Sequence, residues 1–210
     1  MVGPSGCGKT TLLSLLAGLL RPAEGNLQVA GEPVSPRRPG TALIMQDYGL
    51  LPWKTVRENA ALGLVIRNLP TDRADQALVE VGLKDLGNRW PHQLSGGQRQ
   101  RVAIARSLAL DPDLLLMDEP FSALDALTRE EMQDMLLSIW QRHGTSMVLV
   151  THSIAEAVYL GHQIMVLSPR PGRVVGHFHN SAVGDRRGRP FHELINTVRD
   201  ALEKGVEQHG

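Results

Sequence analysis

The sequence predicts an α/β protein with a mostly parallel sheet flanked by helices. A glycine-rich stretch over residues 3–10 runs directly into a helix. Predicted strands and helices then alternate along most of the chain, which indicates a parallel sheet because helices join its successive strands. The apolar stretch 113–117 reads as a buried strand of such a sheet, and two carboxylates follow it.

The first element is a loop suited to phosphate. Residues 3–10, Gly-Pro-Ser-Gly-Cys-Gly-Lys-Thr, fit the pattern G-x-x-x-x-G-K-[ST]. The three glycines allow positive φ and a close approach of the backbone to phosphate oxygens. The next helix, expected over residues 10–19, would point its positive end at the same anion. Lys9 would supply a point charge for the β- and γ-phosphates, and the Thr10 hydroxyl would bind Mg²⁺. The alternative is a glycine-rich turn that precedes a helix by coincidence.

The other elements are bounded by glycines, prolines and capping residues. Alternating polar and apolar residues predict a strand and turn over 25–32, and three prolines make 33–40 a loop. Strands are expected at 41–45, 113–117, 147–150, 163–167 and 173–178. Helices are expected at 55–68, 71–81, 98–110, 127–143, 153–160 and from 190 onward, with Thr55 and Thr71 as caps.

A single domain over residues 1–210 accommodates these elements. The segment from about 50 to 92 is mainly helical and interrupts the alternation, so we expect it to be an inserted helical subdomain. Residues 190–210 predict a C-terminal amphipathic helix.

The composition limits the class of protein. The chain has 22 basic and 22 acidic residues, so its net charge gives no reason to expect a nucleic-acid partner. No apolar run approaches the ~20 residues that span a bilayer. The single cysteine, Cys7, excludes an internal disulfide and fits a reducing compartment. We therefore expect a cytoplasmic protein that reaches a membrane only through a partner.

Asp118 and Glu119 stand at the carboxyl end of the predicted strand 113–117, where α/β folds place their ligands. Asp118 suits the shell of Mg²⁺, and Glu119 can accept a proton from an attacking water. The alternative is a buried strand with solvated charges at its end.

Ser95 and the two glycines after it predict the start of a second helix, whose N-terminus could also bind an anion. Here residues 94–98 read Leu-Ser-Gly-Gly-Gln, and with this stretch the chain resembles the ATP-binding-cassette (ABC) ATPases, a group of P-loop NTPases. Gln46 matches the Q-loop glutamine of that family, residues 122–125 look like its D-loop, and His152 looks like its switch histidine. The motifs stand in the family's order and cover essentially the whole chain.

The resemblance implies a role for each motif. Glu119 would be the general base, His152 would contact the γ-phosphate, and Gln46 would join them in catalysis. Mg²⁺ would be held by Thr10, Gln46 and Asp118. Two copies of the chain would pair head to tail around two ATP molecules, with Ser95 and Gly97 reaching the γ-phosphate bound to the other copy. The residues implied for ATP binding are Gly3, Pro4, Ser5, Gly6, Cys7, Gly8, Lys9, Thr10, Thr11, Ser95, Gly96, Gly97, Gln98 and Asp125.

Two further stretches of the sequence indicate a subgroup within the ABC ATPases. Residues 46–56 and 168–174 are similar to those of ATPase subunits of bacterial importers for nitrate, sulfonates or taurine. Transmembrane permease subunits would dock near Leu50, Leu51, Pro52 and Trp53, and an extracytoplasmic solute-binding protein would act indirectly. The chain would then lie on the inner face of the cell membrane as a peripheral subunit. Packing of Trp53 in the core of the subdomain is the alternative.

Two departures from the family's pattern remain. Ser153 stands where relatives commonly carry Asp, a capping position that either residue can fill. Only Met1 and Val2 precede the phosphate loop, where the family has a strand and an antiparallel hairpin with an adenine-stacking aromatic. We therefore expect an incomplete N-terminal antiparallel part and a truncated version of a longer cassette. The two competing interpretations are a catalytically impaired fragment and a soluble ABC ATPase without a transport role.

Overall fold

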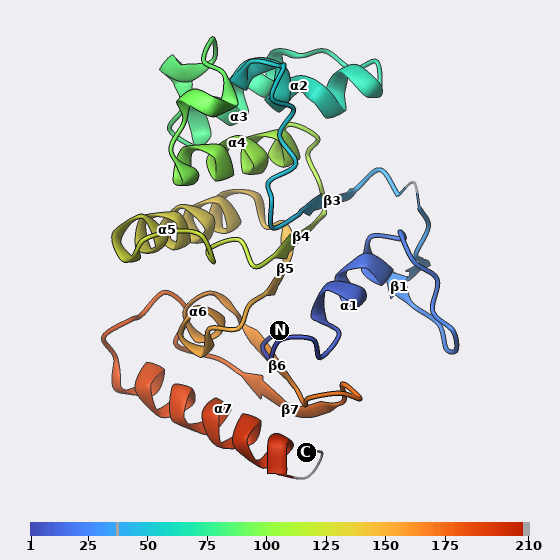
Figure 1. Ribbon diagram of the computed structural model, residues 1–210, viewed down its shortest axis with the longest axis vertical. Helices are drawn as coiled ribbons and strands as arrows, with labels where there is room; N and C mark the ends of the chain where they lie inside the picture. Colours follow the sequence, from blue (N-terminus) through green and yellow to red (C-terminus); the bar gives the residue numbers. More distant parts are fainter. Residues whose placement is uncertain (37, 208–210) are drawn as a thin grey trace. The chain divides into compact units, whose positions relative to one another are not determined.

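A computed structural model describes residues 1–36 and 38–207. The chain divides into two compact units. The first unit comprises residues 1–36 and 148–210, and the second unit comprises residues 37–147. Each unit combines strands with helices, and Figure 1 shows their order along the chain. Residues 208–210 of the predicted C-terminal helix lie outside the described residues.

Two parallel strands form the centre of the second unit. β3 (Thr41–Ile44) pairs with β4 (Leu114–Asp118) in parallel, and Ile44 lies opposite Met117. The first four residues of β4 are at most 6% exposed, as expected of an apolar strand covered on both faces. Their register brings the carboxyl ends of both strands to the same edge, which is where the polar residues 46, 118 and 119 follow.

Three helices of the second unit pack against one another. α2 (Val56–Ile66) contacts α3 (Asp72–Glu80) and α4 (Gly96–Leu108), with the short 3₁₀ turns η1 (Lys84–Leu86) and η2 (Pro91–Gln93) between α3 and α4. In Figure 1 these helices gather above β3 and β4. Small and aliphatic side chains let the helices approach closely; the buried ones include Ala60, Leu64, Ala74, Leu78, Val102 and Ile104.

The helix starts in this region follow capping chemistry, with one exception. Thr55 and Glu58 form a capping box, in which the Thr55 hydroxyl accepts from the Glu58 N–H and Glu58 accepts from the Thr55 N–H. The prediction that Thr71 caps α3 is wrong in one respect. Its side chain makes no capping hydrogen bond, because its backbone is already in the right-handed helical region instead of the extended region that a cap needs.

The long helix α5 (Ala126–His143) completes the second unit. Asp125 caps its start, and Gly144 ends it in the left-handed conformation, with φ 64°. Its last turn is held to α3, because Glu80 accepts from Arg142 at 2.9 Å and lies 2.7 Å from the His143 ring.

In the first unit the two residues before the phosphate loop occupy a strand position. Val2 forms parallel bridges with both Thr151 and Val166 and is fully buried. Its N–H donates to Met165 O at 2.9 Å, and its carbonyl accepts from Leu167 N–H at 2.9 Å. The loop therefore emerges between β6 (Gln163–Leu167) and the residue that follows β5 (Ser146–Val150).

The remaining strands of the first unit are antiparallel. β6 pairs with β7 (Val174–His179), in line with the two strands that the sequence predicts there. The predicted strand and turn at 25–32 becomes the pair β1 (Gln28–Val29) and β2 (Glu32–Pro33), each only two residues long. Ala30 and Gly31 turn the chain between them at φ 54° and 82°.

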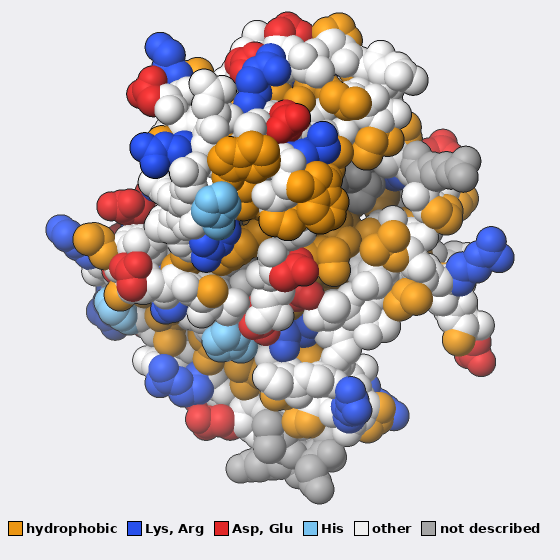
Figure 2. All heavy atoms as spheres, turned by 45° about the horizontal axis from the view of Figure 1, so that its top comes forward, with side chains coloured by type: hydrophobic (Ala, Val, Ile, Leu, Met, Phe, Trp, Pro, Cys, Tyr) orange, Lys and Arg blue, Asp and Glu red, His pale blue; other side chains and the backbone are white. Residues whose placement is uncertain are grey.

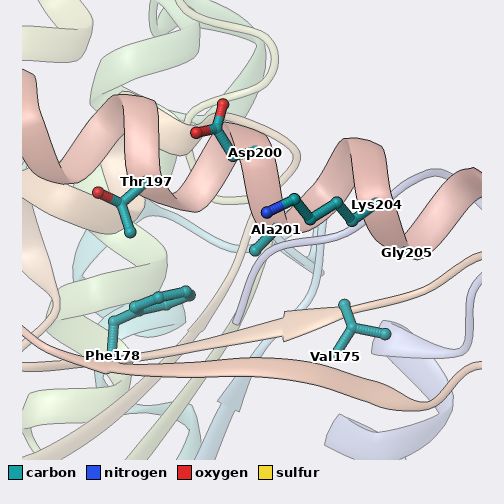
Figure 3. Close-up of a pocket in the computed structure, with 7 residues that line it drawn as sticks. All are labelled: Val175, Phe178, Thr197, Asp200, Ala201, Lys204 and Gly205. Atoms are coloured by element: carbon teal, nitrogen blue, oxygen red, sulfur yellow. The ribbon is translucent and has the colours of Figure 1, made fainter.

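Two helices pack beside β6 and β7. α6 (Ile154–Leu160) and α7 (Arg189–Glu207) contact each other, and α7 also contacts both strands, along which it runs in Figure 1. Between α7 and β7 lies a cavity of about 370 Å³, with the Phe178 ring and Val175 on the strand side (Figure 3). Its other lining residues are Thr197, Asp200, Ala201, Lys204 and Gly205, none of which belongs to the predicted ATP site. Among the residues that the structure describes, no helix is both long and apolar enough to cross a membrane.

Candidate active site

The phosphate loop has the backbone that its glycines allow. Gly6 and Gly8 adopt φ 77° and 105°, a region that other residues rarely enter, and Gly8 forms the N-cap of α1 (Lys9–Leu16). A side chain at Gly3 would come within 2.9 Å of Leu167 O, so the loop start is pressed against β6. α1 is shorter than the predicted 10–19 because Gly18 adopts φ 71° two residues after its end.

Lys9 lies inside this loop. Its side chain is only 5% exposed, and its Nζ donates to Gly3 O at 2.9 Å and to Pro4 O at 2.8 Å. Burial lowers the pKa of the Met1 amino group to about 6, and the positive charge of Lys9 adds to this shift. The ammonium of Lys9 is therefore held at the centre of the loop, where it contributes a fixed positive charge.

These features fit a polyphosphate. Loop amides, an ammonium and the N-terminus of α1 all favour an anion, and the first turn of α1 contains no acidic residue. Ser5, Thr10 and Thr11 are exposed beside the loop, as hydroxyls that reach a nucleotide or its metal ion must be. The first unit therefore holds groups that are suited to bind an anion.

His152 follows the strand neighbour of Val2 in the same unit. Thr151 bridges Val2, so His152 comes at the sheet edge from which the phosphate loop emerges. The Ser153 hydroxyl accepts from the Glu156 N–H at 3.3 Å, which confirms that Ser153 fills the capping position of α6. The buried Thr151 hydroxyl donates to Glu156, which fixes the turn that carries His152.

Asp118 and Glu119 lie at the carboxyl edge of β3 and β4 in the second unit, with Gln46 two residues past the end of β3. Glu119 has a φ of 45°, an uncommon conformation for a residue with a side chain. The N–H and hydroxyl of Ser122 donate to the Glu119 carbonyl at 3.2 and 3.1 Å, which holds this turn. A strained carboxylate next to a second carboxylate is an arrangement suited to a base and a metal ligand.

The stretch 95–98 and Asp125 also meet in the second unit. Ser95 and Gln98 form a capping box at the start of α4, with hydrogen bonds of 3.2 and 3.0 Å. A side chain at Gly97 would come within 2.6 Å of the Thr128 methyl group, so the start of α4 packs on the start of α5. Hydrogen bonds from Thr128 lower the pKa of Asp125, which keeps this cap ionised.

The segment after Gln46 is fixed by two residues that the sequence analysis missed. Arg106 of α4 donates to Gly49 O at 2.5 Å and to Tyr48 O at 2.7 Å. Burial lowers the pKa of this guanidinium, and nearby Asp47 offsets part of the shift. The buried Asn59 of α2 accepts from Leu51 N–H and donates to Leu51 O at 3.0 Å. The segment 48–51 is therefore attached to both α4 and α2.

The structure thus brings the predicted site residues together in two groups. The first unit holds residues 3–11 and His152, and the second unit holds Gln46, Asp118 and Glu119 with the helix starts at 95–98 and 125. Within the described residues, no group of three or more His, Cys, Asp or Glu side chains is placed to bind a metal ion on its own. A metal ion here would need further ligands, such as the hydroxyl and amide that the sequence suggests.

α4 also carries a buried amide without a partner. Gln100 is fully buried, and neither Oε1 nor Nε2 has a hydrogen-bond partner in the described part of the chain. An unsatisfied buried polar group costs about 1–3 kcal/mol. We expect Gln100→Met, which keeps the side-chain volume, to raise the free energy of unfolding by ~1 kcal/mol in urea denaturation.

Gln133 of α5 provides the control for this experiment. It is 5% exposed and does have an interaction partner. Gln133→Met should therefore destabilise the protein, and a loss of stability in Gln100→Met as well would mean that the Gln100 amide is satisfied in solution.

Comparisons with known proteins agree with this geometry. A family model described as "ABC transporter" matches residues 1–122. The taurine import ATP-binding protein TauB of Rhizobium johnstonii is 50% identical over an alignment 181 residues long, and this alignment covers 84% of this chain and 69% of that protein. An uncharacterized ABC transporter ATP-binding protein of Methanocaldococcus jannaschii is 47% identical over a gapped alignment 217 positions long, which covers 99% of this chain and 81% of that protein.

Two solved structures resemble the fold. A dimeric ATP-binding cassette in a post-hydrolysis state, bound to ADP and Pi, has a TM-score of 0.73 and 32% sequence identity. The match covers 85% of this chain and 83% of that one. The protein cbiO1 of Clostridium perfringens, part of an ABC transporter complex, has a TM-score of 0.78 and 28% identity over 97% of this chain and 83% of its own.

Proposed function

The chain belongs to the ABC transporter family of ATPases, which couple ATP hydrolysis to transport, and on this premise we propose that it powers the uptake of a small anion such as taurine, another sulfonate or nitrate. The observation that carries this proposal is the 50% identity to a taurine import ATP-binding protein. In this proposal residues 1–210 act as one cassette, with a helical subdomain over about 50–92 and a C-terminal helix over 190–210. The protein would lie in the cytoplasm, bound to the inner face of the membrane through its partners.

The residues of the phosphate loop would bind the nucleotide. The N–H groups of Gly3 and of residues 5–8 would surround an anion, and Lys9 would add a positive charge that its two backbone acceptors hold in place. Thr10, Gln46 and Asp118 are proposed to hold Mg²⁺, which when bound would neutralise charge on the phosphates. Thr10 is exposed at the first turn of α1 and Asp118 ends β4, so both offer oxygen ligands of the kind that Mg²⁺ prefers.

Hydrolysis needs a base and a group that senses the terminal phosphate. Glu119 is proposed to accept the proton of the attacking water, since a carboxylate can take up that proton as the new P–O bond forms. His152 is proposed to donate a hydrogen bond to the γ-phosphate, and Gln46 to orient the groups around the metal ion.

A second copy of the chain is the proposed partner for catalysis. Gly96 and Gly97 open α4, where the first N–H groups of a helix have no acceptor within the helix, and the capping box of Ser95 and Gln98 holds this turn in place. Asp125 stands beside them at the start of α5. In a head-to-tail pair this surface would face the ATP bound to the other copy. The known dimeric cassette of similar fold supports such a pair.

Permease subunits are proposed to dock on the segment 50–53, with an extracytoplasmic binding protein delivering the solute to them. Trp53 is 68% exposed, so the alternative that it packs in the core of the subdomain is wrong. Hydrophobic side chains gather on the face shown in Figure 2. Large hydrophobic side chains that are exposed in the second unit include Met45, Trp53 and Trp90. A large exposed aromatic is a typical anchor of a protein interface.

Trp53→Ala is expected to weaken assembly with the permease and to leave the ATPase activity of the isolated chain within twofold of its original value. Loss of an aromatic anchor can cost ~2 kcal/mol or more of binding free energy, which corresponds to about 30-fold in affinity. Co-purification with affinity-tagged permease subunits measures the effect. Ile66→Ala is the matched control, since Ile66 is 73% exposed on α2 outside the docking segment. Equal retention of both variants by the permease would contradict the docking site.

The solute is tested by ATP-dependent uptake of labelled taurine, a longer sulfonate and nitrate into vesicles that contain the chain with its permease subunits. Uptake of none of the three would overturn the proposed substrate class and leave the family assignment intact.

A further inference from the structure

The loop between β6 and β7, residues 168–173 (the 168–173 loop), lies against the phosphate loop within the first unit. Arg170 Nε donates to the Gly6 carbonyl at 2.7 Å, and its guanidinium lies about 3.8 Å from the position that a Gly6 side chain would take. A side chain at Gly172 would collide with the Cys7 carbonyl. Two separate points of this loop therefore contact two consecutive residues of the phosphate loop.

The 168–173 loop holds its own shape through one serine. Ser168 is only 1% exposed, and its hydroxyl accepts from the Arg173 N–H at 3.0 Å. The hydroxyl proton has two acceptors within the loop, Pro169 O at 3.0 Å and Pro171 O at 3.2 Å. The Ser168 N–H donates to Arg173 O at 2.8 Å, which closes the loop at its base. Arg170 is thus presented from a braced loop at the end of β6, the strand that also bridges Val2.

The contact at Gly6 fixes the direction of a peptide group. The carbonyl of Gly6 and the N–H of Cys7 belong to one planar trans peptide, so they point to opposite sides. Arg170 holds the carbonyl on the outer side, and the Cys7 N–H points toward Pro4 O at 3.4 Å on the inner side. This inner side also contains the Lys9 ammonium, which donates to the same carbonyl of Pro4.

We propose that Arg170 is a positioning residue for nucleotide binding, which keeps the Gly6–Cys7 peptide turned so that its N–H faces the phosphates. Gly6, at φ 77°, has no side chain to restrict this peptide, and the long 3.4 Å hydrogen bond from the Cys7 N–H to Pro4 O restrains it only weakly. A charge-assisted hydrogen bond from a braced loop removes that freedom before the nucleotide arrives. The inference rests on the proposed function, because it presumes that this loop binds ATP.

Titration with ATP and steady-state kinetics on the same variants test this role. We expect Arg170→Met to raise both the dissociation constant and KM for ATP by about tenfold, with kcat within twofold, since no group assigned to the hydrolytic step is changed. Arg170→Lys should recover most of the affinity, because lysine can still donate a charged hydrogen bond to the Gly6 carbonyl. Gly172→Ala should also weaken binding without any change in charge, because it displaces the loop from Cys7.

Arg173→Met is the matched control. Arg173 is exposed in the same loop, and its guanidinium makes no hydrogen bond or ion pair with any residue that the structure describes. Its loss should change ATP affinity less than twofold. Unchanged affinity in Arg170→Met, or equal weakening in Arg173→Met, would overturn the positioning role. Failure of the unaltered chain to bind ATP would instead refute the proposed function itself, and with it this inference.

Discussion

Lys9→Ala should abolish nucleotide binding at ordinary concentrations. The ammonium of Lys9 is the one side-chain charge in the sequence of the phosphate loop, and the structure holds it at the loop centre by two hydrogen bonds. A hydrogen bond to a charged group contributes about 1.5–3 kcal/mol, and a phosphate would receive both that bond and the charge. We therefore expect the dissociation constant for ATP to rise by about 100-fold or more, measured by calorimetric titration.

Lys84→Ala controls for the loss of one positive charge. Lys84 is exposed in η1, far along the sequence from the loop, and should leave the affinity for ATP unchanged. Because Lys9→Ala also removes the hydrogen bonds that Lys9 donates to the carbonyls of Gly3 and Pro4, the thermal melting of this variant should be recorded alongside. A folded Lys9→Ala variant that binds ATP within threefold of the unaltered chain would refute the assigned role.

Glu119→Gln should keep ATP binding and lose hydrolysis. The carboxylate is proposed to accept the proton of the attacking water, an effect worth about 10²–10⁴-fold in rate, whereas the amide of glutamine cannot accept it. The phosphate loop and Lys9 are untouched, so the affinity for ATP should persist. ATP should then accumulate between two copies of the chain and hold them together as a stable dimer in size-exclusion chromatography.

Glu24→Gln makes the same chemical change on an exposed loop and should behave as the unaltered chain in both measurements. A Glu119→Gln variant that stays monomeric with ATP would contradict the head-to-tail pair. A variant that retains full turnover would show that another group is the base.

The sequence predicted those parts of the fold that depend on neighbouring residues. The strand β4 follows from an uninterrupted apolar run, and the starts of α2 and α4 follow from Thr55 and Ser95 with their partners three residues later. Gly144 ends α5 as expected, because glycine enters the left-handed conformation without strain. The family that these motifs indicate is confirmed by the comparisons.

The sequence could not predict the contacts between distant segments. Arg106 and Gly49 are 57 positions apart, and Arg170 and Gly6 are 164 apart, so no local pattern relates them. An arginine directly after the apolar stretch 102–105 of α4 was the one available signal for the first pair. The expected cap at Thr71 failed for a different reason, because residue type favours a cap but the local backbone decides whether one forms.

For the candidate site, too, the sequence predicted the residue types but not the contacts between distant segments. The motifs predict which residues take part, since a glycine-rich loop with a lysine suits phosphate and paired carboxylates suit metal chemistry. Only the structure reveals that β3 and β4 bring Gln46 and Asp118 to one edge, and that Gly97 packs on Thr128. The roles of these residues in ATP hydrolysis remain proposals that the variants above test.

The positive φ of Glu119 has an evolutionary consequence. A residue with a side chain is strained in this conformation by about 1–3 kcal/mol, whereas glycine or asparagine occupies it at less cost. Random mutation followed by selection for heat resistance alone should therefore favour replacement of Glu119 and, in this proposal, enrich inert proteins. In this proposal, glutamate is retained at this position only while transport itself is under selection.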